Sequence, residues 1–151
     1  MILLDGVEDP HNLGAIIRTA ECAGAAAVVI PERRAAHVTE VVAKTAAGAT
    51  EYLPVARVTN LANFIEKLKR HNVWVVGVEA SGDMDYTQYD YVGAVALCFG
   101  GEGYGLHRLV RERCDVTVSI PMRGHISSLN VSVAVGVVLF EALRQKGKRT
   151  A

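Results

Sequence analysis

Apolar residues occur along the chain in short continuous runs, separated by stretches with helical spacing. The continuous runs predict buried strands at residues 2–4, 26–30, 52–58, 73–78, 95–99 and 116–120. Strands that are apolar throughout, rather than at every second position, are typical of a parallel sheet covered on both faces. Their alternation with helices predicts an α/β fold with a mostly parallel sheet flanked by helices.

Helical spacing is clearest after Pro10. The apolar residues at 13, 16, 17 and 20 fall on one face of a helix, and Asp9 or Asn12 can cap its start. Further helices are predicted at 41–47, 59–68 and 106–114. The polar and aromatic stretch 81–91 predicts a surface excursion.

The last long stretch, residues 119–145, combines the most apolar helix with a polar loop. Pro121 ends a strand, because proline has no N–H for a sheet ladder. From Asn130 a helix begins that is apolar nearly all round, so it must be covered by its own fold or by a second subunit. Ser127, Ser128 and Asn130 at its start are either helix caps or part of a binding site.

Composition narrows the class of protein. A chain of 151 residues predicts one domain with a sizeable core. Lys and Arg number 16, as do Asp and Glu, so net charge does not indicate a nucleic-acid partner. The basic groups at 108–113 and 146–149 are interpreted as a solvated helix face and a frayed chain end.

Cysteine and histidine patterns argue against metal and disulfide chemistry. The three cysteines are far apart and have no metal-ligand spacing, which predicts reduced, buried thiols in a cytoplasmic protein. No apolar run is long enough to span a membrane, and no signal peptide is expected. The histidines, His107 among them, have no partner that the spacing reveals.

Ligands of parallel sheets lie beyond the carboxyl ends of the strands, which here are the loops 5–12, 31–37, 100–105 and 121–130. Loop 100–105 is rich in glycine, but it lacks the offsets and early position of a dinucleotide fingerprint, so it is either a tight turn or a site. Taken singly, Arg18 reads as a surface partner of Glu21, and Glu102 as a solvated carboxylate.

Three blocks taken together change this picture. They are N-x-G-x-x-x-R from Asn12 to Arg18, G-x-E-x-x-G from Gly100 to Gly105, and I-P-M-x-G-x-x-S-S-L-N-V-S-V-A from Ile120. In this order they resemble the signature motifs of the SpoU family of S-adenosylmethionine-dependent RNA ribose 2′-O-methyltransferases, within the SPOUT superfamily. The chain looks most like the branch that methylates a guanosine of bacterial 23S rRNA. Members that modify tRNA, or that confer antibiotic resistance through rRNA, are also similar.

The resemblance implies a C-terminal deep trefoil knot and a homodimer that contacts through the knot helix, with the active site near the contact. It implies a catalytic domain at residues 1–146, followed by a short basic tail at 147–151. Relatives of the rRNA branch carry an N-terminal RNA-binding domain, which is not expected in this chain. RNA is the implied partner, rRNA first and tRNA as the alternative, with no metal and no membrane.

The resemblance also implies roles for residues. Arg18 would act at the ribose 2′-hydroxyl, positioned with Asn12, Glu102, Ser128 and Asn130. S-adenosylmethionine would be held by Phe99, Gly100, Gly101, Ile120, Met122, Ser128 and Leu129. Because arginine keeps its proton in nearly all proteins, we expect Arg18 to stabilise the developing alkoxide or to grip a phosphate rather than act as a base.

Three hypotheses follow. The first is a methyltransferase acting on a ribose of structured RNA, and the second is a cofactor-binding module that holds RNA or protein without turnover. The third is a dinucleotide-dependent oxidoreductase with NAD at residues 100–105, which ranks last because no fingerprint follows the first strand.

Overall fold

The computed structural model describes residues 1–150, with side chains for residues 1–148. The side chain of Arg149 and residue 151, the end of the expected basic tail, lie outside the described residues. Most elements form where the apolar pattern predicts them. Their bounds are β1 Ile2–Asp5, α1 Pro10–Cys22, β2 Val28–Pro31, α2 Glu40–Thr45, the 3-10 helix η1 Ala49–Glu51, β3 Val55–Val58, α3 Leu61–Arg70, β4 Trp74–Val78, β5 Met84–Asp85, β6 Val95–Gly100, α4 Arg108–Arg113, β7 Val116–Ser119 and α5 Val131–Thr150.

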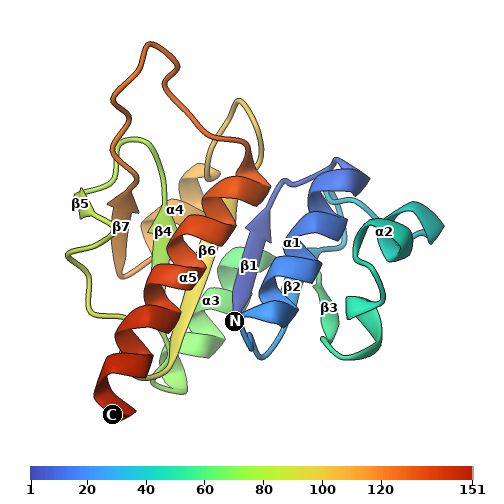
Figure 1. Cartoon of the computed structure of the whole chain (residues 1–151), viewed down its shortest axis with the longest axis horizontal. Helices are drawn as coiled ribbons and strands as arrows, with labels where there is room; N and C mark the ends of the chain where they lie inside the picture. Colours follow the sequence, from blue (N-terminus) through green and yellow to red (C-terminus); the bar gives the residue numbers. More distant parts are fainter. Residues whose placement is uncertain (151) are drawn as a thin grey trace.

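The sheet has seven strands in the order β3-β2-β1-β6-β4-β7-β5 (Figure 1). Every strand pair is parallel, as predicted. Register places Asp5 opposite Gly100, and Val78 opposite Phe99. The carboxyl ends of β1, β4 and β6 therefore lie level with one another, and the loops that follow them share one edge of the sheet.

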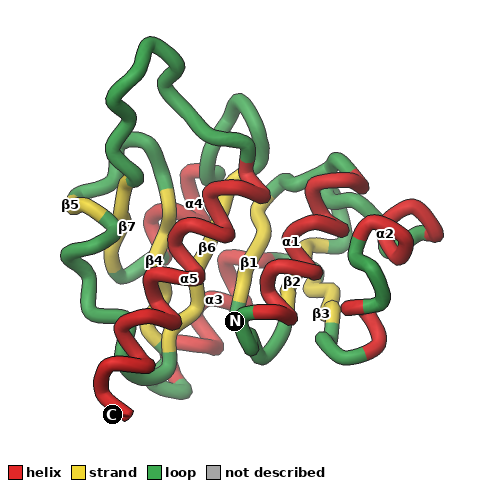
Figure 2. The backbone as a smooth tube through the Cα atoms, in the orientation of Figure 1, coloured by secondary structure: helices red, strands yellow, loops and turns green. Residues whose placement is uncertain are grey.

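Helices cover both faces of the sheet. One buried cluster joins the strands to α1 and α5, with Ile16, Ile17 and Val135 fully buried. The other joins the strands to α3 and α4, with Leu3 of β1, Ile65 of α3 and Val110 of α4 buried together. Figure 2 shows α5, from the end of the chain, lying alongside α1 from its beginning, with the long loop after β7 rising above the sheet edge.

The capping residues act as the sequence indicates. The side chain of Asp9 accepts a hydrogen bond from His11 N at 2.8 Å at the start of α1. Asn60 does the same for Asn63 N, at 2.9 Å, at the start of α3. These short side chains satisfy N–H groups that a helix leaves unpaired in its first turn.

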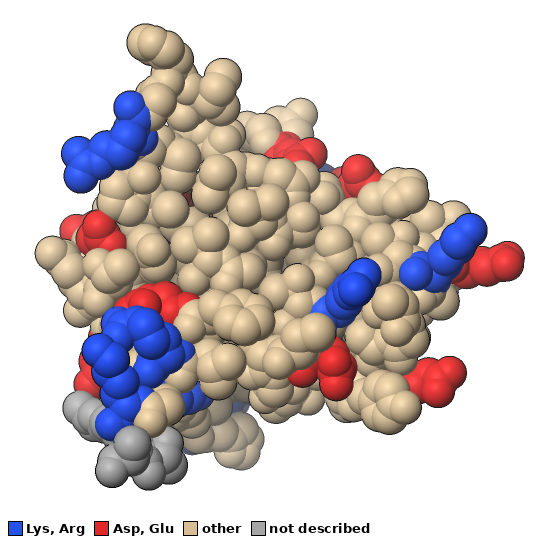
Figure 3. All heavy atoms as spheres, in the orientation of Figure 1, with Lys and Arg blue, Asp and Glu red and all other residues tan. Residues whose placement is uncertain are grey.

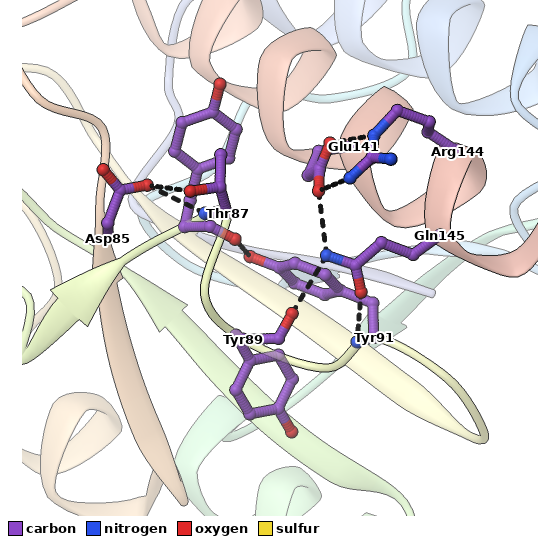
Figure 4. Close-up of polar contacts among 8 residues, drawn as sticks. Asp85, Thr87, Tyr89, Tyr91, Glu141, Arg144 and Gln145 are labelled. Atoms are coloured by element: carbon purple, nitrogen blue, oxygen red, sulfur yellow. Dashed lines mark hydrogen bonds and ion pairs between the residues drawn. The ribbon is translucent and has the colours of Figure 1, made fainter. Parts of the chain in front are cut away.

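Stretch 81–91 is not a simple surface excursion. It contains strand β5, and its last residue, Tyr91, is fully buried. Tyr91 O–H donates to Tyr86 O at 2.8 Å, and Tyr91 N–H donates to Gln145 Oε1 of α5 at 3.0 Å (Figure 4). The aromatic residues that suggested a surface loop instead pack the loop against the last helix.

Two further expectations are corrected. Cys22 is exposed rather than buried, because it lies in the last turn of α1 beyond the buried stripe, whereas Cys98 is buried. A hydrogen bond with Cys114, together with burial, raises the pKa of the Cys98 thiol. Strand β3 begins at Val55, because Pro54 and the 3-10 turn that ends at Glu51 occupy the positions before it.

Candidate active site

A cavity of about 740 Å³ opens at the carboxyl edge of the sheet. It is bounded by the ends of β4 and β6, by the glycine-rich loop after β6, and by the loop between β7 and α5. Its volume is within the range of small-molecule sites. Its lining includes Phe99, Gly100, Gly101, Glu102, Ile120, Met122, Ser128, Leu129 and Asn130.

All seven residues expected to hold the cofactor line this one cavity. Two of them are glycines for a steric reason. A Cβ on Gly100 would lie 2.0 Å from the carbonyl carbon of Gly105, and one on Gly101 would lie 2.1 Å from Gly6 O. Gly101 N–H also donates to Asp5 O at 2.9 Å. The backbone after β6 is therefore held close against its neighbours and forms a wall of the cavity.

The three sequence blocks meet at Asn130. Its Nδ2 donates to Asn12 Oδ1 at 3.0 Å and to Glu102 Oε1 at 2.8 Å. Its Oδ1 accepts from Ser132 N at 2.9 Å and so caps α5. The two readings of Asn130, as helix cap and as part of a site, therefore both apply. One amide joins loop 100–105 to the starts of α1 and α5.

Among the described residues, Ser128 takes no part in the hydrogen bonds of this cluster, and Arg18 lies apart from it. Ser128 is an exposed residue on the cavity wall. Arg18 is exposed on α1, does not line the cavity, and forms no ion pair with Glu21 or any other residue among the described side chains. It is six positions from Asn12, which on an α-helix is about 9 Å along the axis and roughly 120° around it. Within one chain, Arg18 and the Asn12–Glu102–Asn130 cluster thus face different directions.

Two carboxylates line the cavity, and an ion pair with Arg111 balances the charge of one of them, Glu79. Glu79 and Glu102 line it, whereas no Lys or Arg is found among its lining residues in the described part of the chain. Glu79 Oε1 accepts from Leu106 N at 3.1 Å, and its Oε2 lies 3.0 Å from Arg111 Nε. Glu79 thereby braces the loop after β6 and faces the cavity. Such a lining suits a ligand that carries positive charge better than a pyrophosphate.

The sequence analysis missed Glu79 and the partner of His107. Glu79 directly follows β4, so the rule that ligands lie beyond the carboxyl ends of strands could have identified it. His107 ring Nδ1 lies 2.9 Å from Asp5 Oδ1, a contact between residues 102 positions apart that no local pattern reveals. No group of three metal-ligating side chains occurs within residues 1–148. No helix in that part of the chain is long and apolar enough to cross a membrane.

Curated sequences similar to this chain extend well beyond it. The 23S rRNA (guanosine-2′-O-)-methyltransferase RlmB of Pseudomonas putida is 51% identical over 146 residues, which are 97% of this chain and 59% of the relative. The RlmB of Haemophilus ducreyi is 51% identical over 150 residues, which are 99% of this chain and 61% of the relative. The chain thus spans about 60% of the length of the curated relatives it matches.

Solved structures share the fold over nearly the whole chain. The SpoU methyltransferase AviRb from Streptomyces viridochromogenes, in complex with AdoMet, is 33% identical and superposes with a TM-score of 0.89 over 96% of this chain and 57% of that one. The A. aeolicus TrmH/SpoU tRNA modifying enzyme is 28% identical, with a TM-score of 0.90 over 99% of this chain and 76% of that one. The expected α/β fold, with its parallel sheet and SPOUT knot, is confirmed.

The family resemblance carried by the three sequence blocks is tested by a match that covers most of the chain. The sequence profile described as the SpoU rRNA Methylase family matches residues 1–140. These residues include all three blocks and every residue of the Asn12–Glu102–Asn130 cluster. The chain belongs to the SpoU rRNA methylase family.

Proposed function

We propose that this chain transfers a methyl group from S-adenosylmethionine to a ribose 2′-hydroxyl of RNA, with a guanosine of 23S rRNA as the target. The observation that carries the proposal is the meeting of the three sequence blocks at one cavity through Asn130. The names of the RlmB relatives, at about 50% identity, support 23S rRNA and guanosine. The catalytic domain in this proposal is residues 1–146, acting in the cytoplasm.

The cavity fits the cofactor in size and charge. S-adenosylmethionine supplies an activated methyl group on a positively charged sulfur, so the reaction requires no metal. The carboxylate of Glu102 would favour that positive charge. The backbone of Phe99 to Gly101, Ile120 to Met122 and Ser128 to Leu129 would bind the rest of the cofactor, with adenine against the apolar side chains of the wall. The chain's own task is to align the ribose oxygen with the methyl group.

Arg18 acts on the ribose oxygen as a cation. A guanidinium does not lose its proton at neutral pH, so it cannot serve as an ordinary general base. It can stabilise the alkoxide that develops as the 2′-hydroxyl attacks, or hold the adjacent phosphate. Asn12, Glu102, Ser128 and Asn130 position the sugar and the loops around it. Asn130 links Asn12 at the start of α1 to Glu102 in the loop after β6, which fixes the two segments that would flank the ribose.

A second copy of the chain would bring Arg18 to the site. Helix α5 is apolar, yet Val133, Phe140 and Leu143 are 50%, 48% and 42% exposed. Figure 3 shows that the middle of the face over α1 and α5 carries few charged side chains. Burial of this face against a second copy would remove apolar area from water and would place the exposed side of α1 at the contact. The proposed homodimer therefore pairs Arg18 of one protomer with the cavity of the other.

Two measurements test the proposal. Calorimetry with the whole chain should detect S-adenosylmethionine with a Kd of about 1–100 μM and no binding of NAD. Incubation with labelled S-adenosylmethionine and deproteinised 23S rRNA or tRNA should place label on a ribose 2′-oxygen of 23S rRNA. Arg18→Ala should reduce the rate by a factor of about 100 or more, with little change in cofactor affinity.

Other outcomes separate the alternatives. Label in tRNA alone would reassign the substrate, and cofactor binding without label in either RNA would favour a binding module. A fully active Arg18→Ala would refute the role of Arg18. Arg33→Ala is the matched control, because Arg33 is also exposed and lies outside the cavity.

A further inference from the structure

A second cavity of about 250 Å³ lies at the same edge of the sheet, beside the first. It is formed by the loops that follow β1, β2 and β6, which rise together at that edge in Figure 1. Gly101, Tyr104 and Gly105 line both cavities. The second cavity is therefore separated from the first only by the loop that carries Glu102.

The floor of this cavity is fixed by a buried carboxylate. Asp5 is 6% exposed, and its Oδ2 accepts from His107 N at 2.7 Å. Its Oδ1 lies 2.9 Å from His107 Nδ1. Both oxygens of Asp5 are thus engaged, and the imidazole is held in one orientation at the cavity wall. Asp5 and His107 shape the cavity and leave recognition to the residues of the rim.

The rim carries three exposed side chains of complementary chemistry. Glu8 and Arg34 are exposed, and Tyr104 is 90% exposed. None of the three takes part in a side-chain hydrogen bond or ion pair within the described residues. A carboxylate, a guanidinium and an aromatic ring thus surround one small cavity, and the fold uses none of them. This arrangement resembles a binding site more than a solvated surface.

The backbone holds two of these side chains at the rim. Arg34 has a φ of 56°, in the left-handed region that arginine rarely adopts. Its loop is attached to the loop after β1 by the hydrogen bond from Ala36 N to Val7 O, at 3.0 Å. Tyr104 lies at the tip of a tight turn that is closed by the Gly101–Gly105 bridge. Unfavourable backbone at an exposed arginine is often retained for a function.

We propose that this second cavity binds a guanine base of the substrate RNA, stacked on Tyr104 and read by Glu8 and Arg34. The inference rests on the proposed function, since it assumes that RNA reaches the neighbouring cavity. Bases of unpaired RNA are recognised by stacking on aromatic rings and by hydrogen bonds to their edges. Guanine offers N1–H and N2–H donors to a carboxylate, and O6 and N7 acceptors to an arginine.

The same two side chains disfavour the other bases. Adenine offers an acceptor at N1, which the carboxylate of Glu8 would repel, and it presents an amino group where guanine has O6. Cytosine and uracil lack the second ring that would reach both Glu8 and Arg34 across the cavity. The loop shared with the first cavity would keep a base bound here next to the ribose at Glu102. Glu8, Arg34 and Tyr104 therefore determine specificity rather than react.

The test measures base binding without methyl transfer. The whole chain, labelled with ¹⁵N and saturated with S-adenosylhomocysteine to fill the first cavity, is titrated with GMP, AMP, CMP and UMP. GMP should shift the amide signals of Gly6, Tyr104 and His107, with an affinity about tenfold higher than that of AMP. Glu8→Gln should weaken GMP binding about tenfold and leave S-adenosylhomocysteine binding unchanged, because Glu8 lines only the second cavity. Tyr104→Leu should also weaken GMP binding about tenfold.

Controls keep the outcomes distinct. Arg34→Asn removes the guanidinium but keeps a residue that tolerates positive φ, so a folding defect is avoided. Glu51→Gln changes an exposed carboxylate outside both cavities and should leave GMP binding as in the parent. Equal binding of all four nucleotides, or GMP shifts that persist in Glu8→Gln and Arg34→Asn, would overturn the inference. If RNA is methylated but these signals do not move, the inference fails and the proposed function stands. If GMP moves these signals but no RNA is methylated, the proposed function fails and the base site stands.

Discussion

At the scale of single residues, Asn130 shows why an amide is required where the three sequence blocks meet. Its two donor hydrogens are directed at two acceptors, Asn12 Oδ1 and Glu102 Oε1, while its oxygen accepts from Ser132. No other side chain of this size provides two donors and an acceptor in that arrangement. A carboxylate would have the same shape but would face Glu102 with a like charge.

Asn130→Asp should therefore destabilise the fold in a pH-dependent way. At pH 7.5 both carboxylates are charged, and the loss of two donated hydrogen bonds should cost about 1 kcal/mol. Repulsion from Glu102 raises the pKa of the introduced carboxylate, so the penalty should shrink as pH falls and that carboxylate takes up a proton. Urea unfolding at pH 7.5 and pH 5 measures this. An equal loss at both pH values would show that charge repulsion is not the cause, and Asn63→Asp, at an exposed position on α3, should show little change.

At the scale of elements, the segment from β5 to β6 is fastened to α5. Gln145 of α5 accepts from Tyr91 N at 3.0 Å, and its amide donates to Tyr89 O at 3.0 Å and to Glu141 Oε1 at 2.8 Å (Figure 4). Burial raises the pKa of the Tyr91 phenol and keeps it neutral. The hydrogen bonds of Gln145 to Tyr89 and Tyr91 therefore attach the loop before β6 to α5.

Gln145→Ala should loosen this contact. The change leaves Tyr91 N–H and Tyr89 C=O without their partner, at a cost of about 1–3 kcal/mol. The expected result is a lower melting temperature, together with faster amide exchange at Tyr91. Gln88→Ala is the matched control, because the Gln88 side chain is exposed. If the Tyr91 amide of Gln145→Ala exchanges as slowly as in the parent, contacts other than those of Gln145 hold the loop.

Glu141 contributes stability with a defined dependence on pH. Hydrogen bonds from Arg144 and Gln145 lower its pKa from 4.5 to about 2. A depressed pKa in the folded state stabilises the fold above pH 4.5, and that contribution is lost as pH falls towards 2. Glu141→Gln should thus be less stable than the parent at pH 7, by less than about 1 kcal/mol because the pair is partly screened by solvent. The difference should narrow by pH 3, and a difference that widens there would contradict this assignment.

At the scale of the whole molecule, the sequence predicts the layers better than the contacts between distant segments. Continuous apolar runs identified most strands, and the three blocks identified the residues of the main cavity. Local periodicity says nothing about which loop meets which helix, so it missed the buried Tyr91 and the Asp5–His107 contact. The family resemblance grouped Arg18 with Glu102 and Asn130 in an active site near a subunit contact, and within one chain Arg18 lies on the exposed side of α1, outside the cavity.

The separation of Arg18 from the cluster gives a test of the proposed homodimer. If Arg18 serves the partner's cavity, Arg18→Ala and Glu102→Gln inactivate different halves of one shared site. A mixed dimer of these two inactive variants then contains one cavity with an intact Glu102 and an intact Arg18 from the other protomer. Random mixing should restore about a quarter of the parental methyl transfer, since half of the dimers are mixed and each has one working site.

The alternative arrangement makes the opposite prediction. If Arg18 bends back to its own cavity, every protomer of the mixed dimer lacks one required side chain, and no activity returns. Phe140→Lys places a charge on the exposed face of α5, and it should give monomers by analytical ultracentrifugation and abolish the rescue. Rescue that persists in such monomers cannot come from a shared site. In that case the exposed apolar face of α5 and the position of Arg18 would need separate explanations. Recovery of activity only in mixed dimers would explain both by one subunit contact.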